Sequence, residues 1–268
     1  MAVSLVLSQI YLYPVKSLGG IQVQAWELDA FGLRLDRRWM VVTPEGRFMT
    51  QREFPQMAKI QPRIDACGSL RLRHPELGEL EVPAADPTRP RQLVTVWQDA
   101  VAAIPVGAEA DAWLSRAIGA PCRLVWFPDD GERQVDTRYA RAGERTAFTD
   151  GFPLLLLSQS SLDDLNRRLA RPVTVRCFRP NLVVEGALPY AEDGWREIAI
   201  GGKRMRVVKP CSRCAITTVD PETGKFSGKE PLATLATYRK RDQKIYFGQN
   251  LIHQDQGALR VGDRVEVR

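Results

Sequence analysis

Two of the chain's five cysteines lie in the stretch PCSRCAITTVDPETG, residues 210–224. Arg213 lies between Cys211 and Cys214, and a neighbouring positive charge favours the thiolate, the form of cysteine that acts as a nucleophile or metal ligand. The β-branched residues 215–219 predict a strand, and residues 220–224 predict a turn. We therefore expect the two cysteines at one end of a sheet strand, where functional sites are commonly built.

The chain has 268 residues, of which 44% are hydrophobic, and this suits one large globular domain or two closely packed ones. Residues 1–18 lack the pattern of a signal peptide, and no apolar run reaches the roughly 18 residues that a membrane span needs. We therefore expect a cytoplasmic protein without membrane association. The cysteines are odd in number and irregularly spaced, which argues against a disulfide framework.

The formal net charge is +6 and the isoelectric point is about 9.2, values that occur in nucleic-acid-binding proteins. Here the arginines are scattered along the chain, and no nucleic-acid-binding motif gathers them. A small anionic ligand or an acidic protein partner explains the positive charge equally well. We therefore expect no nucleic-acid partner.

Short alternating segments, bounded by Gly, Pro or Asp, dominate residues 52–126 and predict an all-β module. Residues 108–118 are the exception, because their apolar side chains recur at helical spacing and Gly119 provides a stop. A second helix is expected to end at residue 170, with Ser160 or Ser161 as N-cap. A short third helix is expected in 230–240, with Pro231 at its first helical position. Outside the module, further strands are predicted at 5–13, 21–30, 154–157, 173–178, 182–184, 197–200, 203–209, 245–252 and 259–267.

Several polar residues suit anion binding. Lys16 and Ser17 share a loop after the first predicted strand, and an ammonium group beside a hydroxyl suits an oxyanion; a solvated loop lysine is the alternative. Arg179 and Asn181 flank a proline between apolar segments, where a buried guanidinium needs a carboxylate or a bound anion as partner. Residues 128–145 carry four arginines without an apolar period and predict an exposed loop that either closes over an anion or is a solvated linker.

Several common site types do not fit the sequence. A structural zinc site usually needs four Cys or His ligands, and this chain has one CxxC pair and only His74 and His253. A thioredoxin-like dithiol sits at a helix N-terminus, whereas the predicted flanks here are strands. No Ser-His-Asp order, phosphate-binding loop or dinucleotide fingerprint is present. A thiolate beside separated cations remains, and this set suits a phosphate-bearing metal cofactor attached through one sulfur.

Six motifs then resemble, in chain order, those of the MOSC-domain molybdenum proteins, in particular the mitochondrial amidoxime reducing component and its bacterial relatives. The resemblance covers nearly the whole chain, and its most specific part is the cysteine motif. The six motifs are YPVKS (13–17), DRRW (36–39), FRPN (178–181), YAED (190–193), CSRC with TTVDPETG (211–224) and FGQN (247–250).

The resemblance implies a molybdenum cofactor, a molybdopterin whose metal is bound by one protein thiolate, that of Cys214. Cys214 would then be the catalytic and metal-ligating residue, and Cys211 would be a neighbour of undefined role. The positions that match cofactor-binding residues of the family are Lys16, Ser17, Arg37, Asp150, Gly151, Phe152, Arg179, Asn181, Ser212, Arg213, Cys214 and Asn250. Several of these are the anion-binding candidates identified above.

The chain departs from its relatives at two places in this set. Gly151 and Phe152 stand where relatives have Thr-Ser, so backbone amides would have to replace hydroxyl contacts. Asn250 stands where some relatives have an aromatic residue. The cysteine spacing of a plant-type ferredoxin domain, which some bacterial relatives carry, is also absent. Electrons would then come from a separate donor of the ferredoxin, flavodoxin reductase or cytochrome b5 type, steered by opposite charge.

We therefore expect a mainly β (α+β) protein. A MOSC β-barrel with the cofactor site would be formed by residues 1–37 and 128–268, and residues 38–127 would form an inserted β-rich N-terminal module. The expected function is molybdenum-dependent reduction of small N-hydroxylated compounds of the amidoxime or hydroxylamine type. The alternatives are a molybdopterin carrier without turnover and a CxxC thiol–disulfide oxidoreductase.

Overall fold

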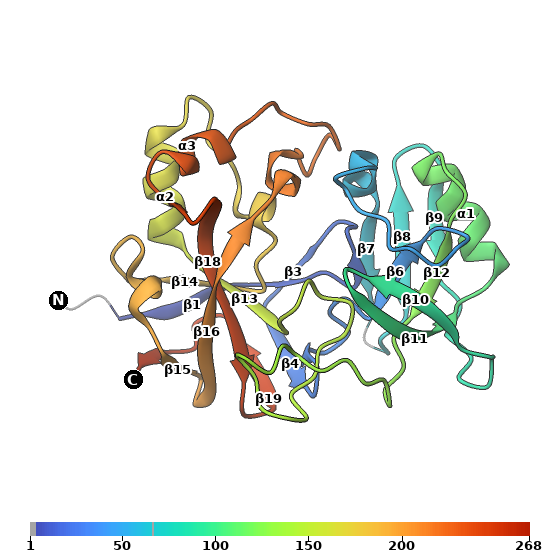
Figure 1. The fold of residues 1–268 in the computed structure, drawn as a ribbon, viewed down its shortest axis with the longest axis horizontal. Helices are drawn as coiled ribbons and strands as arrows, with labels where there is room; N and C mark the ends of the chain where they lie inside the picture. Colours follow the sequence, from blue (N-terminus) through green and yellow to red (C-terminus); the bar gives the residue numbers. More distant parts are fainter. Residues whose placement is uncertain (1–3, 66) are drawn as a thin grey trace.

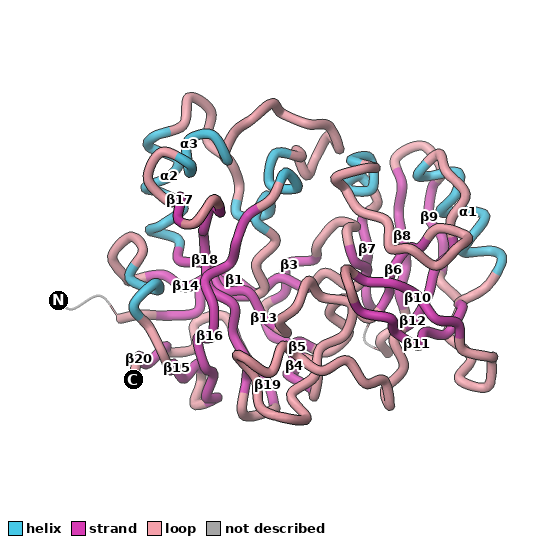
Figure 2. Tube along the Cα trace, in the orientation of Figure 1, coloured by secondary structure: helices cyan, strands magenta, loops and turns pink. Residues whose placement is uncertain are grey.

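The computed structural model describes residues 4–65 and 67–268, and its architecture is mainly β (Figure 1, Figure 2). Two parts lie side by side. One is built mostly from the C-terminal half of the chain, and the other mostly from residues between positions 39 and 126 (Figure 1). In the described part of the chain, no helix is both long and apolar enough to cross a membrane.

The first part is organised around its largest sheet, which has nine strands within the described residues. They are β1 (Val6–Leu12), β3 (Ile21–Val23), β13 (Leu154–Ser158), β14 (Leu182–Glu185), β15 (Glu197–Ile200), β16 (Lys203–Arg213), β17 (Lys240–Arg241), β18 (Lys244–His253) and β20 (Val265–Val267). Their order is β20-β15-β16-β18-β13-β14-β1-β3, with β17 paired to β18. Strand β1 from the start of the chain therefore lies beside strands from its second half.

The two ends of this sheet approach one another. Backbone hydrogen bonds of 2.9 and 2.8 Å join Leu7 to Asp263 and Gly262, in the turn that leads into β20, and Val6 forms an isolated bridge with Arg264. The sheet is therefore strongly curved, but these few contacts do not make β1 and β20 neighbouring strands, so the sheet is not closed into the predicted barrel. Its strands contribute buried aliphatic residues such as Ile10 to one core, and full burial of such a side chain is worth roughly 1.5–3 kcal/mol.

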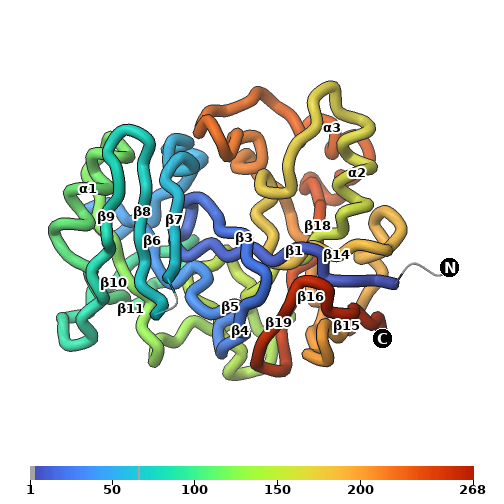
Figure 3. Tube along the Cα trace, turned by 180° about the vertical axis from the view of Figure 1, so that it is seen from behind, coloured from blue at the N-terminus to red at the C-terminus, as the bar shows by residue number. Residues whose placement is uncertain are grey.

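The second part contains two further sheets. One has the order β10-β11-β12-β6-β2, and the other has the order β7-β8-β9. Their strands are β2 (Val15–Lys16), β6 (Trp39–Val42), β7 (Gln61–Ile64), β8 (Leu70–His74), β9 (Gly78–Glu81), β10 (Gln92–Val96), β11 (Asp99–Pro105) and β12 (Arg123–Trp126). A fourth sheet, seen from behind in Figure 3, joins β19 (Gly257–Arg260) to β4 (Ala25–Asp29) and β5 (Gly32–Leu33).

The helices are few and lie at the periphery (Figure 2). They are α1 (Ala108–Ile118), α2 (Gln159–Arg168), α3 (Leu232–Ala236) and the 3₁₀ turns η1 (Pro55–Lys59), η2 (Val175–Phe178), η3 (Ala191–Gly194) and η4 (Ala215–Thr218). Helix α1 has the predicted bounds, and Gly119 ends it in the left-handed conformation with φ of 76°. The mainly β class is therefore confirmed.

Three predicted strands are wrong. Residues 215–219 are mostly the 3₁₀ turn η4, because the Thr217 and Thr218 hydroxyls donate to carbonyls three residues earlier and so stabilise a helical turn. Residues 173–178 end in η2, since a short apolar run does not distinguish a strand from a buried helical turn. Residues 259–267 split at Gly262 between β19 and β20, which lie in different sheets.

Two predicted helix starts are also wrong. Ser158 is the N-cap of α2, with no capping bond from its side chain; its hydroxyl pairs with that of Ser160 at 2.6 Å instead. Pro231 is the N-cap of α3 and not its first helical residue. The predicted strand 21–30 is divided between β3 and β4, which pair with different partners.

Candidate functional site

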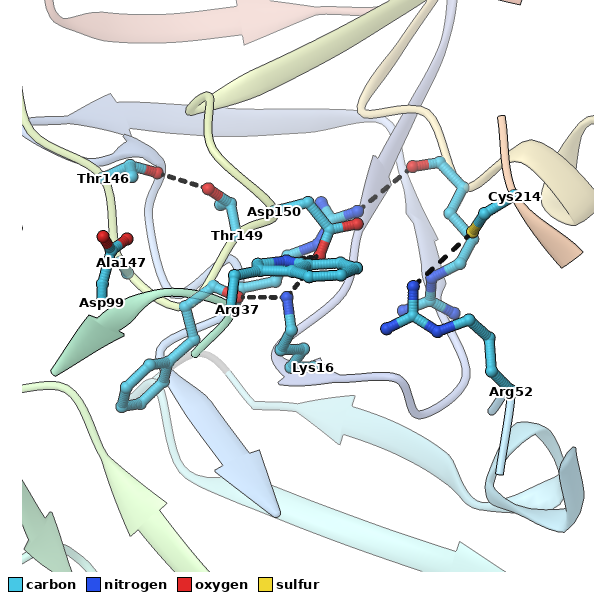
Figure 4. A network of polar contacts seen from close by, with 12 residues as sticks. Lys16, Arg37, Arg52, Asp99, Thr146, Ala147, Thr149, Asp150 and Cys214 are labelled. Atoms are coloured by element: carbon cyan, nitrogen blue, oxygen red, sulfur yellow. Dashed lines mark hydrogen bonds and ion pairs between the residues drawn. The ribbon is translucent and has the colours of Figure 1, made fainter. Parts of the chain in front are cut away.

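A pocket lies between the two parts of the molecule. Lys16 reaches it from β2, Arg52 from the turn after β6, Asp150 from the segment before β13, and Cys214 from the end of β16 (Figure 4). All the cofactor-binding candidates from the sequence line this pocket, and the full lining is Lys16, Ser17, Arg37, Thr50, Arg52, Thr149, Asp150, Gly151, Phe152, Leu155, Phe178, Arg179, Asn181, Cys211, Ser212, Arg213, Cys214, Ile216 and Asn250.

Cys214 is exposed and sits where β16 ends and η4 begins. Its backbone is extended, and its carbonyl accepts hydrogen bonds from the backbone amide and the hydroxyl of Thr217. The Arg52 guanidinium lies 3.8 Å from its sulfur (Figure 4). An accessible sulfur with a cation beside it can act as a ligand for a metal or as a nucleophile.

Cys211 lies deeper and is held differently. Arg213 donates to its sulfur at 2.9 Å and to the Phe178 carbonyl at 2.5 Å. Burial raises the pKa of the Cys211 thiol, and the nearby Arg213 charge only partly opposes this effect. The two cysteines are therefore unequal, with Cys214 open to a ligand and Cys211 part of the wall that positions Arg213.

Lys16 is buried at the base of the pocket and donates to the Phe148 carbonyl at 2.9 Å and to Asp150 at 2.5 Å (Figure 4). Burial lowers the pKa of Lys16 to about 8, although Asp150 acts to raise it. Desolvation acts to raise the pKa of Asp150, but the Lys16 ammonium outweighs it and holds that pKa well below its usual range. Ser17, also buried, has a positive φ of 65°, and its carbonyl accepts from Gln51.

Arg37 and Arg179 both stack on the ring of Tyr13, each 4.3 Å from its centroid. Arg37 is paired with Asp36 at 2.6 Å, whereas Arg179 donates to the Leu18 carbonyl at 2.6 Å. Burial, and next the Arg37 charge, lower the pKa of Arg179 to about 10. Among the described residues no carboxylate forms an ion pair with Arg179, so a bound anion would supply its missing counter-charge.

The remaining sequence candidates differ in what they offer a ligand. Asn181 uses its side chain within the fold, accepting from the Leu155 amide and donating to the Tyr11 carbonyl. Asn250 donates to the Lys209 carbonyl from the neighbouring strand. A side-chain carbon added at Gly151 would meet nothing within 4 Å, so the pocket has open space at this position.

Ser212 and Phe152 complete the set. Ser212 lies on β16 between the two cysteines and pairs with Tyr246 of β18. Phe152 contacts Tyr139 edge-on at 5.8 Å, which links the pocket wall to the 128–145 loop. That loop does not line the pocket, and Arg133 within it is bound to the Ala147 and Thr149 carbonyls at 2.7 Å each.

The sequence reasoning missed Arg52 and Trp97. Arg52 lies in a turn with no apolar pattern, so nothing local marks it as part of a site. Trp97 lies in the turn between β10 and β11 and donates from Nε1 to Asp150 at 3.1 Å. An aromatic residue at a hairpin turn, where small or polar residues are usual, was the available signal.

The arrangement joins one open sulfur to a group of cations. Within residues 4–65 and 67–268, no group of three or more His, Cys, Asp or Glu side chains is placed to hold a metal. A metal at this pocket would therefore have to arrive with its other ligands, on a cofactor. The Nε atom of Arg213 is a buried donor with no partner among the described residues, and with Arg179 it fits an anionic, phosphate-bearing group.

Fold and site together define a mainly β protein with a cation-lined pocket around one thiol. The model of the MOSC N-terminal beta barrel domain matches residues 4–121, and the model of the MOSC domain matches residues 143–266. The chain is 36% identical to mitochondrial amidoxime-reducing component 1 of Xenopus laevis and 37% identical to that of Mus musculus, in each case over 97% of this chain and 81% of the relative. The protein belongs to this family of MOSC-domain proteins.

A second group of relatives is named molybdenum cofactor sulfurase. That of Solanum lycopersicum is 33% identical over 97% of this chain, but the match covers only 35% of the relative. The family assignment and these names together indicate a function related to the molybdenum cofactor.

Proposed function

We propose that the protein is a molybdenum cofactor-dependent reductase that removes oxygen from small N-hydroxylated compounds, with electrons from a separate redox protein. The observation that carries the proposal is the open Cys214 sulfur at the mouth of a pocket that also contains Lys16, Arg37, Arg179 and Arg213. The relatives named amidoxime-reducing component support the choice of substrate class.

The pocket residues would have two different roles in binding the cofactor. Cys214 would bind the metal through its sulfur, and Arg179, Arg213 and Lys16 would hold the phosphate-bearing part of the cofactor by charge-assisted hydrogen bonds. The bound cofactor would supply a metal that takes up the substrate oxygen and passes through two oxidation states. The protein fixes the thiolate, leaves one side of the sulfur open and supplies the surrounding positive charge.

The electron donor is proposed to be an acidic protein of the ferredoxin, flavodoxin reductase or cytochrome b5 type. The basic net charge of +6 supports this choice, because opposite charges speed the encounter of two proteins. Added salt should then slow turnover with the protein donor but not with a small uncharged reductant. Equal salt dependence with both would remove the argument for charge steering.

Metal analysis combined with a benzamidoxime reduction assay, using an artificial reductant, tests the proposal. Bound molybdenum with turnover supports the reductase. Bound molybdenum without turnover supports a cofactor carrier. A metal-free protein that is active on disulfides would instead support thiol–disulfide exchange by Cys211 and Cys214.

A further inference from the structure

Trp97 occupies an unusual position for a large aromatic residue. It lies with Gln98 in the two-residue turn between β10 and β11, where Val96 pairs with Asp99. Its φ is +57°, and Gln98 is not among the residues with positive φ. A positive φ at only the first central residue is typical of a type II′ turn, which strongly prefers glycine there. A bulky residue in this conformation is strained, and such strain is concentrated at functional sites.

The side chain of Trp97 makes contacts that explain why the strain is retained. Trp97 is 43% exposed, but its ring still makes two contacts. The ring centroid lies 5.3 Å from that of Phe48 and 4.4 Å from the Arg52 guanidinium carbon. Its Nε1 donates to Asp150 at 3.1 Å. The same Arg52 reaches the Cys214 sulfur, and the same Asp150 pairs with Lys16 (Figure 4).

A second connection fixes the turn in place. Asp99, the residue that follows the turn, accepts from Nε of Arg133 at 2.8 Å. Arg133 also donates to the Ala147 and Thr149 carbonyls, directly before Asp150. The turn is therefore bound to the segment that carries Asp150 at two points, which makes the Trp97 contact part of a fixed arrangement.

We propose that Trp97 is a positioning residue through which the β10–β11 turn completes the pocket. Its indole N–H holds Asp150 against Lys16, and its ring holds the Arg52 guanidinium beside the Cys214 sulfur. The kinetic consequence rests on the proposed function, whereas the positions of Asp150 and Arg52 do not.

The test compares Trp97→Gly, Trp97→Phe and the control Leu93→Ala, all in the full-length protein. Leu93 is 73% exposed in β10 of the same hairpin and is not a pocket residue. Glycine relieves the backbone strain but removes both contacts, so Tm should stay the same or rise while kcat/KM for benzamidoxime falls about 10-fold or more. Phenylalanine keeps a ring for Arg52 to stack on and should restore part of that loss. Leu93→Ala should leave kcat/KM unchanged.

A readout without turnover keeps the test independent of the proposed function. The chain has six tryptophans, so its indole N–H signals can be resolved by ¹H–¹⁵N NMR, and the Trp97 signal is the one lost in Trp97→Phe. Asp150→Ala should shift that signal and speed its exchange with solvent, because the acceptor is gone.

The outcomes distinguish the inference about Trp97 from the proposed function. An unchanged indole signal in Asp150→Ala would overturn the inference, even if the enzyme is active. Wild-type kcat/KM in Trp97→Gly would also overturn it, as would an activity loss that only follows a fall in Tm. An inactive wild-type protein with the expected indole shift would instead contradict the proposed function and leave the positioning of Asp150 supported.

Discussion

Asn181 should be needed for stability as well as for shaping the pocket. It is 2% exposed, and its side chain links two strands, through Leu155 in β13 and Tyr11 in β1. Asn181→Ala would leave one amide and one carbonyl of these strands without partners, at about 1–3 kcal/mol each. The two groups together would cost about 2–6 kcal/mol of unfolding free energy. Because Leu155 is partly accessible to water, we expect the lower part of this range, about 2–4 kcal/mol.

Thermal unfolding of the cofactor-free protein, followed by circular dichroism at neutral pH, measures this loss. A chain of this length loses about 2 °C of Tm per kcal/mol, so Asn181→Ala should lower Tm by about 4–8 °C. Asn250→Ala is the matched control, because that amide makes a single bond to Lys209 and should cost about 1 kcal/mol. Equal Tm values for Asn181→Ala and the wild type would refute the structural role of Asn181.

Three further changes test other parts of the site and fold. Cys214→Ala should abolish molybdenum retention while Cys67→Ala, at an exposed thiol outside the pocket, should not; metal retained in Cys214→Ala would contradict the ligand assignment. The pKa of Lys16 falls from 10.5 to about 8 on folding, so its contribution to stability should increase as the pH rises from about 8 to 10.5. The free energy of unfolding of Lys16→Met, measured with urea, should not show this increase. A pH profile of stability identical to that of the wild type would contradict the lowered pKa of Lys16. Gly248→Ala should cost about 1–3 kcal/mol, because φ is +84° and the new carbon would lie 2.8 Å from the Leu156 carbonyl; a Tm within about 1 °C of the wild type would contradict this.

Much of the fold could be predicted because the chain repeats simple local patterns. The strand at 197–200, the Gly201-Gly202 turn and the strand that follows agree with β15 and β16, since alternation and paired glycines act locally. The 3₁₀ turns at 175–178 and 215–218 could not be predicted in this way. Side-chain hydroxyls and a left-handed Arg179 determine them, and these contacts depend on the folded surroundings.

For a similar reason, only some residues of the candidate site could be predicted from the sequence. Lys16, Arg179 and Cys214 carry local signals, namely a loop cation, a guanidinium beside proline and a basic CxxC, and the structure brings them to one pocket. Their cofactor-binding roles stay predictions. Arg52 and Trp97 belong to the other part of the molecule, and only the packing of the two parts shows that they meet Cys214 and Asp150.

The division of the pocket between distant segments has a consequence for how the protein is made. Lys16 is synthesised near the beginning of the chain, whereas Asn250 lies in β18, the strand that supports both β13 and the cysteine-bearing β16. Domains generally fold as units during synthesis, beginning from the N-terminus. Here β1 pairs with β14 from the C-terminal half, so this pairing can form only after β14 has been synthesised. A nascent chain that stops short of β18 lacks Asn250 and the strand that pairs with β16, so the proposed cofactor would bind only after translation has passed β18.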